Sequence, residues 1–176
     1  MDPEKKVNGI SIVTSPYNQF ENPLYSNNKI IGTYVNSIMA LHDAIERGSD
    51  EALLLDSNEN ISEGSGENLF IVKDEELITP TPDNCLNGIT RQSIIKIAQD
   101  ENIDVIEKKL KYEDLVDADE AFFTGTAVEV TPISKVDETT IGDSMIGPIT
   151  KKLQKIFTDT VTNKNKKYAH WLDPIN

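Results

Sequence analysis

The chain has 176 residues, of which 38% are hydrophobic and 27% charged, enough for one folded domain with a sizeable core. Its net charge of -13 argues against binding to nucleic acids or anionic membranes, because such a field repels both. The single cysteine, Cys85, has no partner for an internal disulfide, no apolar run approaches a membrane span, and the N-terminus lacks the apolar core of a signal peptide, so we expect a cytoplasmic protein.

The first part of the chain predicts a strand, a loop and a helix. Residues 7–14 are typical of a strand, and residues 15–28 are polar and contain two prolines, which indicates a loop. From about Thr33 to Arg47 the apolar residues recur at helical spacing, and Gly48 supplies a C-terminal stop.

A run of short strands follows. Residues 51–56 and a return strand from Ile61 are separated by a turn at 57–60. Residues 68–73 and 77–79 form the next predicted pair. Because the strands are short and the turns tight, we expect mainly antiparallel pairing.

The remainder mixes helices and strands. An amphipathic helix is predicted from Gln92 to about Glu101. The other predicted elements are a strand at 103–110, a helical turn at 112–116, a buried strand at 121–123, a short strand at 128–131 stopped by Pro132, and a last helix at 149–161.

The segment Ile61–Phe70, with the sequence ISEGSGENLF, places an acidic residue on a tight turn beside an apolar strand. A carboxylate is solvated more cheaply by water than by a protein interior unless a positive partner compensates. We predict that Glu63 is this carboxylate and that its partner is the protonated ring nitrogen of pyridoxal phosphate. The alternative is a solvated turn that Glu63 only caps.

Lys29 and Tyr34 are the next candidates. Lys29 stands at a loop-to-helix entry beside Ile30 and Ile31, and an amine that attacks a carbonyl works best when partly desolvated. Tyr34 could reach back toward a phenolic oxygen near this lysine. The alternatives are a surface lysine and a core aromatic residue.

Two segments are candidate anion sites. Gly88-Ile89-Thr90 opens a helix, whose free N–H groups and dipole favour a phosphate. Thr124-Gly125-Thr126-Ala127 ends a buried strand with hydroxyls and a glycine. An N-cap and a strand-end turn are the plain alternatives. With only His42 and His170 in the chain, no histidine-based metal site is expected.

Taken together, these motifs resemble the C-terminal, cofactor-carrying part of the fold-type IV aminotransferases, and within them the branched-chain amino-acid aminotransferases. Ile30 and Thr33 depart from the Lys-Ala-x-Gly-Asn-Tyr pattern of several branched-chain enzymes. The matching blocks are Lys29–Ser37, Glu51–Asp56, Ile61–Phe70, Leu86–Arg91, Asp119–Pro132 and Gly147–Gln154.

The resemblance implies a role for each candidate. Lys29 would be the catalytic lysine that attaches to the cofactor and later shuttles a proton, while Tyr34 and Glu63 would hold the cofactor's phenolic oxygen and ring nitrogen. Ile89, Thr90 and Thr126 would bind the phosphate, and Thr126 and Ala127 the substrate. Arg91 should not replace the phosphate-binding arginine that the family's N-terminal domain supplies.

The resemblance also implies fold and activity. We expect an α/β domain over residues 1–176, with a mixed, largely antiparallel sheet or pseudo-barrel wrapped by helices, and without the family's N-terminal domain. The implied reaction is pyridoxal-phosphate-dependent amino transfer between leucine, isoleucine or valine and 2-oxoglutarate, with a homodimer or higher homo-oligomer in the complete enzyme. The alternatives are a D-amino-acid aminotransferase, an aminodeoxychorismate lyase, or a folded domain without catalysis.

Overall fold

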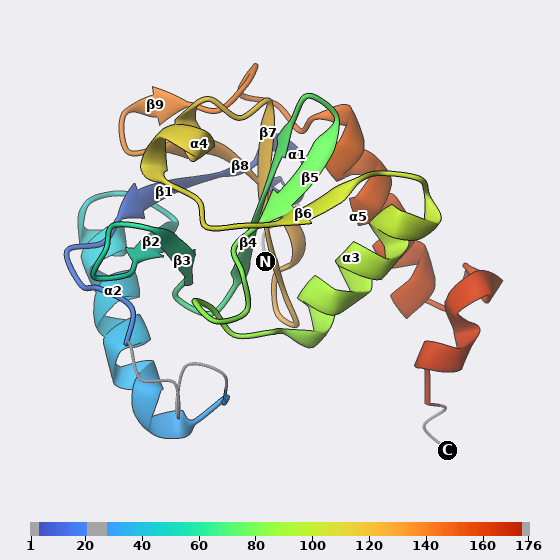
Figure 1. The fold of residues 1–176 in the computed structure, drawn as a ribbon, viewed down its shortest axis with the longest axis horizontal. Helices are drawn as coiled ribbons and strands as arrows, with labels where there is room; N and C mark the ends of the chain where they lie inside the picture. The colour runs from blue at the N-terminus through green and yellow to red at the C-terminus, as the bar shows by residue number, and fades with distance from the viewer. Residues whose placement is uncertain (1–3, 21–27, 174–176) are drawn as a thin grey trace.

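The computed structural model describes residues 4–20 and 28–173. One curled sheet forms its centre, with the three longest helices on its outer sides (Figure 1). The strands are β1 Ile10–Thr14, β2 Glu51–Leu55, β3 Ile61–Gly64, β4 Asn68–Lys73, β5 Glu76–Thr79, β6 Val105–Glu107, β7 Glu120–Gly125, β8 Glu129–Val136 and β9 Thr139–Thr140. The α-helices are α1 Lys5–Asn8, α2 Tyr34–Glu46, α3 Ile89–Asp100, α4 Tyr112–Val116 and α5 Pro148–Val161, and 3-10 helices span Ile31–Thr33 and Lys166–Trp171.

The strands lie in the order β3-β2-β1-β8-β7-β4-β5-β6, and β9 pairs with β8. Pairs β1–β2, β1–β8 and β5–β6 are parallel, whereas the hairpins and β4–β7 are antiparallel. The two ends of the sheet meet where the Ile61 N–H donates to the Leu110 carbonyl at 2.7 Å. The expected mixed, largely antiparallel sheet is confirmed, and this contact gives it the shape of a half-closed barrel.

Strand β4 shows why the sheet is buried on both faces. Successive side chains of a strand point to opposite faces. Leu69 and Ile71 join the core inside the curl, while Phe70 and Val72 pack with residues of α3 and α5 on the outside. Helices α3 and α5 contact each other on this outer face (Figure 1). A strand with four consecutive apolar residues therefore needs two cores, and the fold supplies both.

Helix α2 covers the other arm of the sheet through small side chains. Ala40 and Ala44 are fully buried against Val13, Ala52 and Leu54. The predicted helix is confirmed, and Gly48 ends it with φ at +81°, a conformation that favours glycine. Most of the apolar residues whose spacing predicted it are exposed, however, namely Val35, Ile38, Met39 and Ile45.

Three element predictions need correction. Residues 7–8 belong to helix α1 rather than to the first strand, and the strand predicted over 103–110 is only Val105–Glu107 with an isolated bridge at Leu110. Pro132 does not stop its strand: β8 runs to Val136. Pro132 pairs with Phe122 of β7 and precedes Ile133, where pairing with β1 begins, so its missing N–H interrupts no bond to β1.

Within the described residues, the helices are all too short or too polar to cross a membrane.

Candidate active site

The central turn lies between β3 and β4. The Gly64 N–H donates to the Glu67 carbonyl at 2.7 Å, which closes the turn. A Cβ at Gly64 would lie 3.0 Å from the Phe123 ring and 3.0 Å from Glu67 Oε2. A side chain at position 64 would therefore require the Phe123 ring or the Glu67 carboxyl group to shift, and the turn packs directly on the sheet.

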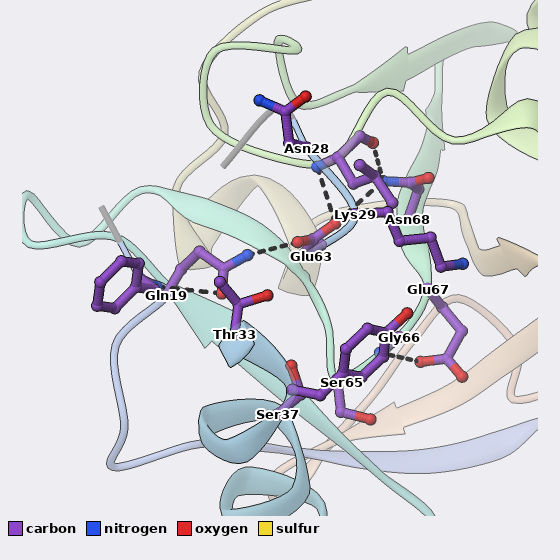
Figure 2. Close-up of a pocket in the computed structure, with 13 residues that line it drawn as sticks. Gln19, Asn28, Lys29, Thr33, Ser37, Glu63, Ser65, Gly66, Glu67 and Asn68 are labelled. Atoms are coloured by element: carbon purple, nitrogen blue, oxygen red, sulfur yellow. Dashed lines mark hydrogen bonds between the residues drawn. The ribbon is translucent and has the colours of Figure 1, made fainter. Parts of the chain in front are cut away.

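Glu63 is held by three donors (Figure 2). Its Oε2 accepts the Leu86 N–H at 3.1 Å and the Asn68 amide at 3.2 Å, and its Oε1 accepts the Gln19 amide. Burial raises the pKa of Glu63 to about 7, although the hydrogen bonds from Leu86 and Gln19 and the charge of Lys29 act in the opposite direction. Burial therefore makes ionisation of Glu63 unfavourable, and the hydrogen bonds and the charge of Lys29 offset part of that free-energy cost.

Lys29, Tyr34 and Glu63 line one pocket, together with Gln19 and Asn68. Its empty volume is about 600 Å³, including open solvent at its mouth. The Lys29 amine and the Glu63 carboxylate thus border the same pocket, as binding of one ligand by both requires (Figure 2).

The surroundings of Lys29 differ from the expectation. Lys29 is exposed, Ile30 is half-buried and Ile31 is 87% exposed, so the amine is not enclosed by an apolar cluster. The expectation of an apolar setting was wrong for the described chain, because Ile31 begins a 3-10 helix that faces solvent. The amine is accordingly accessible to a ligand that enters the pocket.

The start of α3 adjoins this pocket without lining it. The Asn68 amide donates to the Leu86 carbonyl at 2.7 Å, and a Cβ at Gly88 would lie 2.5 Å from Asn68 Oδ1. Ile89 is 82% exposed, and Thr90 is buried at the first turn. Both belong to the lining of a separate groove with the C-terminal segment.

The β7–β8 turn lies at another side of the pocket. A Cβ at Gly125 would come 3.5 Å from the Gly66 carbonyl and 3.6 Å from Glu67 Cγ. Thr126 and Ala127, which follow it, are exposed in the turn and do not line the pocket. Both candidate anion segments are therefore neighbours of the pocket rather than part of its wall.

A second carboxyl group lines the pocket from the same turn. Glu67 also lines an adjoining cavity with the buried Glu51. Burial first, and then the neighbouring Glu51, raise the pKa of Glu67 to about 8.

Arg91 has a structural position. It is 1% exposed, and its guanidinium donates to the Pro80 carbonyl at 2.8 Å and pairs with Glu107 at 2.5 Å. It does not line the pocket of Lys29 and Glu63.

Residues 1–136 match the model of the amino-transferase class IV family. The chain belongs to that family. It is 44% identical over 172 residues to a branched-chain-amino-acid aminotransferase of Pseudomonas aeruginosa, covering 97% of this chain and 56% of the relative. The chain thus spans about half the length of the curated relatives it matches.

Solved structures of class IV aminotransferases agree in fold. The branched-chain amino acid aminotransferase of Escherichia coli superposes with a TM-score of 0.95 at 40% identity, over 99% of this chain and 58% of that one. The enzyme of the same name from Thermobaculum terrenum, in its pyridoxal-phosphate-bound holo form, gives 0.93 at 29% identity, over 100% and 58%. The predicted resemblance and fold class are therefore confirmed.

The three donors to Glu63 in this class IV aminotransferase pocket were missed from the sequence: Gln19, Asn68 and the Leu86 N–H. Gln19 lies in a loop without regular spacing. Leu86 acts through its backbone, which no side-chain pattern reveals. Asn68 stands in the Ile61–Phe70 motif at the start of its strand, and its position five residues after Glu63 could have suggested a shared wall.

Proposed function

We propose that this chain is the cofactor-carrying domain, over residues 1–176, of a pyridoxal-phosphate-dependent aminotransferase. The proposed reaction moves the amino group between branched-chain L-amino acids (leucine, isoleucine, valine) and 2-oxoglutarate. The observation that carries the proposal is that the Lys29 amine and the Glu63 carboxylate line a single pocket, with Glu63 fixed by three donors.

The pocket suits pyridoxal phosphate on chemical grounds. Burial raises the pKa of Glu63, which means that ionising this carboxyl group is unfavourable. A cationic N–H donor beside it would stabilise the ionised form. An exposed lysine amine in the same pocket suits an aldehyde. The start of α3 beside Asn68 offers backbone N–H groups next to the pocket, which suits a phosphate.

The bound cofactor would supply an electron-withdrawing ring that acidifies the substrate α-carbon. Glu63 would hold the ring nitrogen and its proton. The Lys29 Nζ would attach to the cofactor. After the substrate binds, the same amine would remove the α-proton of the substrate and deliver it to the cofactor. Tyr34 would orient the phenolic oxygen.

The other candidate residues have roles at the edge of the pocket. Ile89, Thr90 and Thr126 would bind the phosphate, and Thr126 with Ala127 would hold the substrate carboxylate. These assignments require the ligand to extend from the pocket toward the start of α3 and the β7–β8 turn, which adjoin it through Asn68 and Gly66.

The substrate assignment is supported by the relatives described above, all of which are branched-chain aminotransferases. A D-amino-acid aminotransferase and an aminodeoxychorismate lyase would use the same lysine and carboxylate. Rates with leucine, isoleucine and valine against D-alanine separate these options. The assays use the chain alone and the chain mixed with the N-terminal half of the Pseudomonas aeruginosa relative, and sedimentation of both samples tests for the proposed homo-oligomer.

Cofactor binding is tested by visible absorbance after pyridoxal phosphate is added to the chain. Covalent attachment of the aldehyde to a lysine amine generates a new band, which we expect in the wild type and not in Lys29→Ala. Lys155→Ala is the matched control, because that amine is on the surface of α5, where it pairs with Asp159. A wild type without the band, or a band that persists in Lys29→Ala, would reject the proposal in favour of a domain without this chemistry.

A further inference from the structure

Glu51 and Glu67 form a buried carboxyl pair beside the pocket, in addition to Glu63. Glu51 is 7% exposed at the start of β2, and Glu67 lies at the end of the central turn, directly before β4. Both line a cavity that Phe123 and Val128 also line, and the neighbouring Glu51 contributes to the raised pKa of Glu67. Two carboxylates in one cavity repel each other, whereas a proton on one of them removes the repulsion and provides a donor to the other.

The pair also holds the backbone of the turn. Glu51 Oε1 accepts the Ser65 N–H at 3.2 Å and the Ala52 N–H at 2.7 Å. Glu67 Oε2 accepts the Gly66 N–H at 3.0 Å (Figure 2). Ser65 and Gly66 are themselves walls of the pocket that contains Lys29 and Glu63. One carboxyl group from β2 and one from the turn thus fix two consecutive amides of the pocket wall.

We propose that Glu51 and Glu67 share one proton, and that this neutralised pair positions the Ser65–Gly66 turn and leaves the negative charge of the turn on Glu63. Glu67 is a positioning residue, because it acts on the site through the turn. This inference deepens the proposed function and depends on it for its link to the cofactor.

The charged groups around the pair favour this arrangement. Glu63 opposes ionisation of Glu67 from the pocket side, and Asp50 is a further acid in the adjoining cavity, where Lys5 pairs with it at 2.6 Å. Lys29 and Tyr34 line the pocket that Glu67 borders, and the charge of Lys29 stabilises ionised Glu63. A proton on Glu67 removes a like charge from the vicinity of Glu63.

The first test is a titration of the chain without added cofactor, with ¹³C-labelled glutamate carboxyl groups. We expect one resonance with a midpoint near pH 8 that is missing in Glu67→Gln and moves to lower pH in Glu51→Gln, whose amide donates to an ionised Glu67. Glu138→Gln is the control, because it removes an exposed glutamate with the same change of charge. A Glu67 midpoint near 4.5, or one that Glu51→Gln leaves in place, would overturn the shared proton.

The second test measures the turn itself by amide hydrogen exchange. Glu67→Gln keeps a neutral donor to Glu51 and an acceptor for Gly66, so we expect Ser65 and Gly66 to exchange as in the wild type. Glu67→Ala should make Gly66 exchange about tenfold faster, since its bond is lost. Equal exchange in Glu67→Ala and wild type would overturn the positioning role. Should Glu67→Ala fail to fold, Glu51→Ala is measured instead: Ser65 loses its acceptor and should exchange about tenfold faster, and unchanged exchange there would overturn the role.

Cofactor affinity links the pair to the site. Pyridoxal phosphate should bind Glu67→Gln within about twofold of wild type and Glu67→Ala about tenfold more weakly. Equal affinity in Glu67→Ala and wild type would contradict the link. If the wild type binds no cofactor while the titration and exchange results hold, the proposed function fails and the proton-sharing pair stands.

Discussion

At the scale of single residues, the chemistry of Glu63 is set by opposing effects. Burial makes its ionisation costly, whereas the Leu86 N–H, the Gln19 amide and the charge of Lys29 favour it. Unsatisfied buried carboxylates are destabilising, so this balance explains why three donors converge on one side chain.

The substitution Glu63→Gln tests the role of this carboxylate in the proposed reaction. The neutral amide has no negative charge to keep a proton on a ring nitrogen, and its own hydrogens compete with the Leu86, Gln19 and Asn68 donors. We expect covalent attachment at Lys29 to persist and the transamination rate to fall by about 10²-fold. The rate is measured in the complemented assay with leucine and 2-oxoglutarate, with Glu138→Gln as the control; an unchanged rate would remove Glu63 from the mechanism.

The raised pKa values of Glu63 and Glu67 also predict how stability depends on pH. In the window from about 4.5 to 8 the folded chain binds these protons more tightly than the unfolded chain, so the free energy of unfolding falls as pH rises. We expect a fall of up to about 7 kcal/mol between about pH 5 and pH 8.5, measured by urea denaturation without cofactor. Glu67→Gln should flatten the slope, and a wild-type stability that rises across this window would contradict the assignment.

Residues with distinctive chemistry were accessible to sequence reasoning, and residues that act by position were not. Lys29, Tyr34 and Glu63 were predicted from their surroundings in the sequence and line one pocket. The roles of these three residues stay predictions, as do those of Ile89, Thr90, Thr126 and Ala127. The exposure of Lys29 could not be foreseen, because Ile30 and Ile31 look like core residues until the start of α2 is placed at the surface.

At the scale of elements, helix α5 shows how one side chain can fix a helix on the sheet. Glu120 of β7 is 7% exposed, and its carboxylate accepts the N–H groups of Ile149 at 3.0 Å and Thr150 at 2.6 Å. A carboxylate at a helix N-terminus is favourable for both its hydrogen bonds and the helix dipole. The contact requires Gly147, where a Cβ would lie 2.1 Å from Glu120 Cδ.

Gly147→Ala should therefore destabilise the chain. The added methyl displaces the Glu120 carboxylate from the first turn of α5, and we expect a loss of about 2 kcal/mol in the free energy of unfolding. Gly32→Ala is the control, since nothing lies within 4 Å of its Cβ position, and it should change stability by less than about 0.5 kcal/mol. Equal effects of the two substitutions in urea denaturation would show that Glu120 does not need this close approach.

Element type was more predictable than element extent or burial. Strand β4 and helix α4 were predicted with the observed bounds, because turn residues flank β4 and α4 is a short local motif. Strand β8 extends past Pro132 because the proline lies before the pairing with β1, a tertiary fact. Helix α2 packs on the sheet through Ala40 and Ala44, so its larger apolar residues are exposed. The spacing of those larger residues did not reveal which side of the helix packs.

At the scale of the whole molecule, closure of the curled sheet connects the core to the site. Ile61 is fully buried at the start of β3, and its N–H donates to the Leu110 carbonyl, which joins the two ends of the sheet. Glu63 lies two residues further along this strand, opposite Leu54 of β2. The position of Glu63 in the pocket therefore depends on how β3 is held at its other end.

Ile61→Ala should weaken both stability and cofactor binding. Truncation leaves a cavity in the core inside the curl, for which we expect a loss of about 3 kcal/mol in the free energy of unfolding. Because β3 also carries Glu63, pyridoxal phosphate should bind about tenfold more weakly to the fraction that remains folded, as measured by absorbance at low temperature. The control is Ile106→Ala on β6. Ile106 borders the same core but is only half-buried, and it is far from Glu63 in the sequence. It should cost less stability and leave affinity unchanged, whereas equal loss of affinity in both variants would mean that general destabilisation, and not the position of β3, governs the site.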